Sequence, residues 1–277
     1  MPRTRSNFGI IGASIVANNT TYRTFYSLQD QYVGMSNRTY PLGPLNGIPV
    51  NFMIQGAGGG SIAAGSSYNW PCASAGGVQR QGNTVLAIGT TAVVTVGAGG
   101  TSASNGSPSI FYSTTATGGE GNPYQLPHGG NNADFLGAQV AYNGGGGGAG
   151  AGESAGISAG KVNNNVGGNG TSWWVDGVTR GGGGGAQGAA GGAGGGGNHI
   201  TNGTVNTGGG GGASDFGNAG GLGGSGLVIL RYPDYIANLS SIGVGLTYQW
   251  SNTYSSNGVS TGYKTYTFTA GTGNITF

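Results

Sequence analysis

The sequence predicts an all-β or irregular fold in which short β-strands flank a bundle of polyglycine II helices, with almost no α-helix. Glycine accounts for 67 of the 277 residues, roughly three times the usual share of about 7%. Uninterrupted glycine runs occupy residues 144–148, 181–185, 194–197 and 208–212. Short stretches rich in β-branched and aromatic residues lie around these runs. Apolar positions at helical spacing, combined with good helix formers, are nearly absent.

Few structures accept long glycine runs. Collagen needs glycine at every third position and abundant proline, whereas these runs are continuous and the chain has only 9 prolines. A flexible linker is the simplest alternative. In polyglycine II the chain forms an extended threefold helix without internal hydrogen bonds. Neighbouring helices must then supply the hydrogen-bond partners, so several separate runs are needed, and the sequence has several.

The expected strands follow in chain order. Residues 50–55 place Phe52 and Ile54 on one face and Met53 on the other. Residues 84–96 form a second candidate, which is broken by Gly89. In its later half Thr91, Val93 and Thr95 alternate with Ala92, Val94 and Val96, the pattern of a half-buried strand.

The last expected strands lie near the C-terminus. The continuous apolar run at residues 227–232 ends at Pro233 and predicts a buried strand. Residues 244–250 and 263–269 are rich in β-branched and aromatic residues. A glycine turn then leads to residues 274–277.

Three zones follow from these features. Residues 1–48 form an N-terminal attachment arm, residues 49–233 the glycine-rich domain, and residues 234–277 a C-terminal β segment. The apolar stretch at residues 8–17 resembles the core of a short signal peptide, but Ile15 stands where a small residue is preferred before a cut at Ala17. We expect an uncleaved strand or anchoring arm there.

Composition argues against several classes of function. Charged residues make up 6% of the chain against a typical share of about 25%. This low share favours a protein that is part of a larger assembly. The net charge is +2, and no lysine or arginine cluster follows the first five residues, so no nucleic-acid partner is expected. No apolar stretch approaches the roughly 20 residues of a membrane helix, so no membrane insertion is expected.

Chemistry-bearing residues are sparse and scattered. Cys72 is the single cysteine, which excludes an internal disulfide and a CxxC metal site. His128 and His199 lie far apart, and no third ligand stands at metal spacing. Nothing in the spacing of the acidic residues favours a paired-carboxylate glycosidase site. We therefore expect neither an enzyme nor a bound metal or cofactor.

Three motifs carry a family resemblance. VNFMIQGAGGGS at residues 50–61 and AVVTVGAGG at residues 92–100 each run from a strand into glycines, and GGSGLVILRYP closes the region at residues 223–233. This order resembles the glycine-rich domain of bacteriophage tail-fibre and virion structural proteins. A looser similarity links the chain to the polyglycine II adhesins of T-even-like phages.

The resemblance implies a virion structural protein that is assembled in the host cytoplasm beside other virion proteins. A tail-fibre or adhesin component would bind a host surface glycan or outer-membrane protein through loops between the glycine runs. The alternative is a capsid decoration, head fibre or structural adaptor protein. A homo-oligomer, and by family analogy a trimer, is expected.

Large side chains in the loops are the candidates for recognition, because exposed aromatic residues are favoured at binding sites. The alternative is that they pack on the bundle or at a subunit interface. Adjacent residues of an extended segment point to opposite sides, so at least one member of the tryptophan pair should face outward. The receptor-binding candidates are Trp173, Trp174, Tyr124, His128, Phe135, His199 and Phe216. The candidates for attachment to the particle are Phe8, Tyr22, Phe25 and Tyr26.

Overall fold

The computed structural model describes residues 47–62, 72–121, 130–137, 148–152, 165–214, 218–254 and 260–277. The chain divides into two compact units, Met1–Gly47 and Ile48–Phe277, and the description below concerns the second. Strands, turns and extended segments make up these described residues, with no helix among them. The all-β prediction is thereby confirmed. The particle-attachment candidates Phe8, Tyr22, Phe25 and Tyr26 lie outside the described residues.

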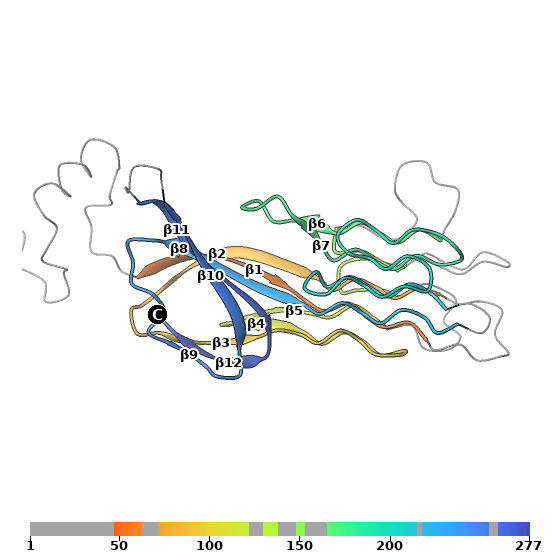
Figure 1. Ribbon diagram of the computed structural model, residues 1–277, viewed down its shortest axis with the longest axis horizontal. Helices are drawn as coiled ribbons and strands as arrows, with labels where there is room; N and C mark the ends of the chain where they lie inside the picture. Colours follow the sequence, from red (N-terminus) through yellow and green to blue (C-terminus); the bar gives the residue numbers. More distant parts are fainter. Residues whose placement is uncertain are drawn as a thin grey trace, which may run out of the picture. The chain divides into compact units, whose positions relative to one another are not determined.

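Five antiparallel strands form one sheet in the spatial order β10-β11-β8-β1-β2 (Figure 1). These strands are β1 (Ile48–Gln55), β2 (Gln79–Leu86), β8 (Leu227–Pro233), β10 (Thr247–Tyr254) and β11 (Ser260–Ala270). The central strands β1 and β8 are mostly buried on both faces, which explains the continuous apolar run in β8. As predicted, Phe52 and Ile54 enter the main core, and Met53 enters a separate cluster.

A second sheet has the order β5-β4-β3-β12-β9. Its strands are β3 (Thr91–Thr95), β4 (Ser109–Phe111), β5 (Thr114–Ala116), β9 (Ser241–Ile242) and β12 (Thr272–Thr276). Apolar residues of both sheets form one core, in which the ring centroids of Phe52 and Phe111 lie 5.5 Å apart. The predicted alternation is confirmed, because Ala92, Val94 and Val96 are buried in this core.

The C-terminal strands pair within this chain. β11 runs antiparallel to β8 and places Tyr266 opposite Leu230. β12 runs antiparallel to β3 and places Ile275 opposite Ala92. Residues after Pro233 therefore complete both sheets, and they belong to the same compact unit as the glycine-rich region.

The glycine-rich segments continue from the strand ends and lie side by side (Figure 1). Successive amides of residues 56–61, directly after β1, donate to three neighbouring segments in rotation, at 2.9 to 3.2 Å. Gly56 and Gly59 donate to residues 78 and 75, Ala57 and Gly60 to residues 107 and 104, and Gly58 and Ser61 to residues 224 and 221. The same neighbour therefore returns at every third residue.

This period is the one that a threefold helix requires, because polyglycine II has three residues per turn and no internal hydrogen bonds. Residues 74–78 show it again. Ser74 and Gly77 donate to residues 211 and 208, and Ala75 and Val78 donate to residues 120 and 117. We call this network of hydrogen bonds between segments the glycine lattice. The helical geometry of the individual segments stays a prediction.

The glycine lattice needs bare backbone where its segments approach most closely. A Cβ atom on Gly58 would lie 2.0 Å from the carbonyl oxygen of Gly209, and one on Gly183 would lie 2.0 Å from that of Gly148. Small methyl groups fill the remaining space, as in the buried cluster of Ala73, Ala186 and Ala213. The glycine runs are therefore ordered structure where they are described.

Gln55 joins the sheet to the glycine lattice. It is the last residue of β1 and is fully buried. Its Nε2 donates to the carbonyl oxygens of Gly77 at 2.7 Å and Gly56 at 3.2 Å, and its Oε1 accepts from Gln79 Nε2 at 3.4 Å. One amide thus satisfies polar groups on both sides of the boundary.

Gln55→Leu is expected to lower the free energy of unfolding by about 1–3 kcal/mol, because it leaves buried backbone carbonyls without this donor. Chemical denaturation measures the change. Gln81→Leu is the control, since Gln81 is an exposed residue of the neighbouring strand β2 and should change stability by less than about 0.5 kcal/mol. Equal stability of the two variants would contradict a role for Gln55 at the boundary.

Candidate functional site

The two adjacent tryptophans lie on a short hairpin formed by β6 (Thr171–Ser172) and β7 (Thr179–Arg180). Its turn is closed by an ion pair between Arg180 and Asp176, with the nitrogen and oxygen atoms 2.7 Å apart. Trp173 is 1% exposed and Trp174 is 61% exposed. One of the pair faces outward, as the alternation of an extended segment predicts.

Trp173 packs against the outer face of the β1 and β8 strands. Its partners in this cluster are Met53, Leu227 and Ile229. Such burial argues against a receptor contact and assigns Trp173 to packing. Trp174 is the member of the pair that a receptor could reach.

Of the remaining recognition candidates, two lie within the described residues and stand on different loops. His199 is half-buried in the turn after residues 194–197, and its amide donates to the Ala189 carbonyl. Phe135 is half-buried on a different loop, at residues 131–137. Tyr124, His128 and Phe216 lie outside the described residues. The described candidates therefore come from three separate segments of the chain.

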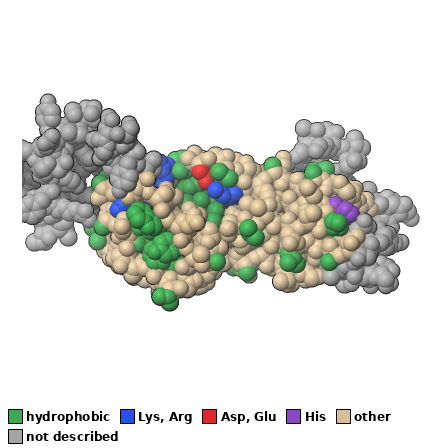
Figure 2. Space-filling model, viewed as in Figure 1, with side chains coloured by type: hydrophobic (Ala, Val, Ile, Leu, Met, Phe, Trp, Pro, Cys, Tyr) green, Lys and Arg blue, Asp and Glu red, His purple; other side chains and the backbone are tan. Residues whose placement is uncertain are grey.

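Exposed apolar residues occur at turns of the glycine lattice. Ile200, Val205 and Leu222 are 42%, 68% and 44% exposed. The amide of Gly203 donates to the Leu222 carbonyl at 2.8 Å, so these turns are neighbours. The sequence-based selection of aromatic loop residues did not include these three residues, because they are aliphatic. Charged side chains are few on the face drawn in Figure 2.

An open groove of about 310 Å³ lies between residues 117–121 and 130–133. The described residues that line it are Asn105, Thr117, Gly118, Glu120, Asn131, Asn132 and Ala133. Asn132 anchors one wall, because its Nδ2 donates to the carbonyl oxygens of Gly150 at 2.9 Å and Gly76 at 3.2 Å. Sequence analysis did not single out this groove, since its amides and hydroxyl have no distinctive spacing.

An ion pair stands on the same loop as the groove wall. Asp134 accepts from Arg80 of β2 through both carboxylate oxygens, at 2.6 and 3.0 Å. These side-chain hydrogen bonds lower the pKa of Asp134, and burial partly opposes them. The stabilisation is present above the unfolded-state pKa of Asp134 and is lost as the pH falls through its folded-state pKa.

Metal-binding clusters are not found in the described part of the chain. No three His, Cys, Asp or Glu side chains gather there in a way that could hold an ion. A search of the same residues finds no helix long and apolar enough to cross a membrane. Cys72 is buried and is not part of a disulfide.

Comparison with known families agrees with the fold. A family model described as a glycine-rich domain matches residues 39–233. The chain belongs to the glycine-rich domain family. In this glycine-rich domain the match ends at Pro233, the last residue of β8, so it includes the glycine lattice and the strands that enter and leave it. A search of curated proteins and a search of solved structures each found no match.

Proposed function

We propose that the protein is a non-enzymatic structural component of a bacteriophage virion, in a tail fibre or adhesin. Loops between the glycine segments would contact the host receptor. The chain would act in a homo-oligomer, a trimer by family analogy, beside other virion proteins. The observation that carries this proposal is a contrast in structure. The glycine lattice is built mainly from backbone, whereas the turns expose large side chains.

The lattice supports the proposal because backbone groups, and not large side chains, fill its interior. Amides of residues 56–61 and 74–78 are committed to neighbouring segments, so the backbone N–H groups of these residues are not available to a receptor. Large exposed side chains occur instead in the turns, at Trp174, Val205 and Leu222. Turn residues can change without altering the lattice, which suits a surface that must match a receptor.

A second candidate function is a capsid decoration, head fibre or adaptor protein. It is favoured by the edge strand β10, where Tyr248 and Trp250 are 39% and 50% exposed. Exposed aromatics on an edge strand suit a contact between subunits. Antibody labelling of intact particles separates the candidates, because tail-tip label supports the adhesin and capsid label supports decoration.

Trp174→Ala is expected to reduce adsorption of particles to host cells by at least about tenfold, the effect of removing an aromatic anchor from an interface. Particle assembly should be unchanged, since the ring is exposed. Val85→Ala is the control, because Val85 is 62% exposed on β2, away from the turns. Adsorption that is unchanged in both variants would contradict the role proposed for Trp174.

A further inference from the structure

The groove beside Glu120 presents a set of fixed hydrogen-bonding groups. Asn105 Oδ1 accepts from the Gly121 amide, and Asn131 Oδ1 accepts from the Gly137 amide, both at 2.8 Å. With each carbonyl oxygen held by backbone, each side chain keeps its NH₂ group for a ligand. The lattice thus fixes two amide donors before any ligand arrives.

Glu120 is held in the same way. Its Oε2 accepts from the Asn131 amide at 2.8 Å, and its own amide donates to the Asn131 carbonyl at 2.8 Å. Within the described residues no N–H or O–H group donates to Oε1, so this oxygen can accept a hydrogen bond from a ligand. The exposed hydroxyl of Thr117, which can both donate and accept, completes the set.

These groups discriminate between classes of ligand. A calcium ion takes six to eight oxygen ligands, but the amide oxygens of Asn105 and Asn131 already face backbone N–H groups. An anion would meet the Glu120 carboxylate, and the described residues that line the groove include no lysine, arginine or histidine. An apolar ligand would leave the amides without partners.

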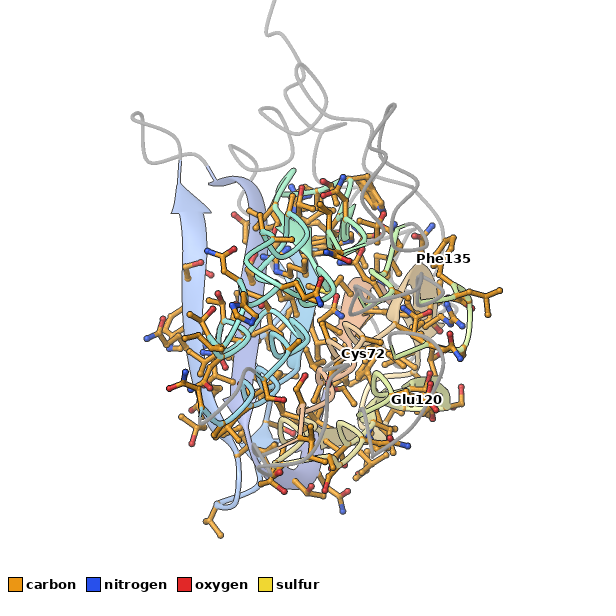
Figure 3. The ribbon with its side chains drawn as sticks, turned by 90° about the vertical axis from the view of Figure 1, so that its right-hand side faces the viewer. Cys72, Glu120 and Phe135 are labelled. Carbon is orange, nitrogen blue, oxygen red and sulfur yellow. The ribbon has the colours of Figure 1, made fainter. Side chains whose placement is uncertain are left out.

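A neutral polyhydroxyl compound can form hydrogen bonds with all of these groups. Every sugar hydroxyl can donate to the Glu120 carboxylate or accept from an amide NH₂ group. The volume of about 310 Å³ lies at the lower end of the roughly 300–1,000 Å³ range of small-molecule sites. Figure 3 labels Glu120 and Phe135 on one side of the molecule, and Phe135 belongs to the loop that forms one wall.

We infer that the groove formed by Asn105, Thr117, Glu120 and Asn131 binds a neutral sugar residue of a surface glycan. This assignment deepens the proposed function and rests on it, since the glycan would be part of the host receptor. The carboxylate accepts from sugar hydroxyls, and the two amides donate to them.

The test is a titration of isotope-labelled protein with glucose, galactose and N-acetylglucosamine, each alone, followed by NMR at Gly118, Gly121 and the Asn131 side chain. At least one sugar should give saturable shifts at these positions. Glu120→Gln keeps the acceptor for the Asn131 amide but replaces Oε1 by a donor, and should weaken binding by about tenfold or more. Asp134→Asn makes the same charge change outside the groove lining and should leave binding unchanged.

Two results would overturn the assignment: no shifts with any of the sugars, or equal binding by wild type and Glu120→Gln. Saturable shifts with calcium chloride alone would also overturn it, in favour of a cation site. Adsorption assays separate this inference from the proposed function. Adsorption lost in Trp174→Ala without sugar binding refutes only the groove, whereas sugar binding with unchanged adsorption in Trp174→Ala and Glu120→Gln supports the groove and refutes the adhesin.

Discussion

Gly58→Ala is expected to lower the free energy of unfolding by at least about 4 kcal/mol or to prevent folding, beyond the usual range for overpacking. The added Cβ would lie 2.0 Å from the Gly209 carbonyl oxygen and 2.4 Å from its carbonyl carbon. Relief requires movement of the Gly209 carbonyl, which accepts from the Gly224 amide at 2.8 Å, or of Gly58, whose own amide donates to the Gly224 carbonyl at 2.9 Å. A flexible side chain could move aside, but a hydrogen-bonded backbone segment cannot do so alone.

Gly188→Asn is the matched control in the same glycine-rich region. Gly188 has φ of +74°, and a Cβ there would meet nothing within 4 Å. Asparagine tolerates this left-handed conformation better than most residues, so stability should fall by less than about 1 kcal/mol. Thermal and chemical denaturation of both variants measure the difference. If Gly58→Ala is as stable as Gly188→Asn, segments 56–61 and 208–214 do not approach as described.

Trp173→Ala is expected to destabilise the protein by about 3–5 kcal/mol, the cost of removing a large aromatic side chain from a packed site. The indole covers Met53, Leu227 and Ile229 on the outer face of the sheet that contains β1 and β8. Its loss would open a cavity beneath the β6–β7 hairpin. The free energy of unfolding from denaturant titration is the measurement.

Trp174→Ala serves as the control within the same hairpin. Trp174 is 61% exposed, and its truncation should change stability by less than about 0.5 kcal/mol. The adjacent tryptophans therefore differ in exposure, and recognition is proposed only for Trp174. Equal destabilisation by both substitutions, or none by Trp173→Ala, would contradict the burial described for this hairpin.

The strands could be predicted from sequence because their side-chain pattern has a period of two. Ala92 and Val94 alternate with exposed or half-exposed neighbours, and residues 227–230 are apolar because both faces of β8 are covered. β2 extends back to Gln79, further than the sequence predicts, because the polar residues that follow Gln79 lie at half-buried and exposed positions and show no apolar pattern.

The glycine lattice and the groove were harder to predict for a different reason. Repeated glycines carry no side-chain pattern that says which segment neighbours which, so the pairing of Gly58 with Gly224 is settled only in three dimensions. The two tryptophans are equivalent in sequence, and the apolar cluster under Trp173 decides which one faces inward. The groove is lined by Asn105 and Asn131 from two lattice segments, and the spacing of these residues in the sequence does not predict that they lie together.

Amide hydrogen exchange at the glycines of the lattice tests the central claim most directly, namely that these runs are an ordered, hydrogen-bonded scaffold. The amides of Gly58, Gly59 and Gly76 donate to other segments at 2.8 to 2.9 Å, and such amides exchange only when the structure opens. We predict that they exchange as slowly as the amides of the central strands β1 and β8. Exchange of these glycines at the rate of an unfolded chain, while β1 and β8 stay protected, would contradict the account.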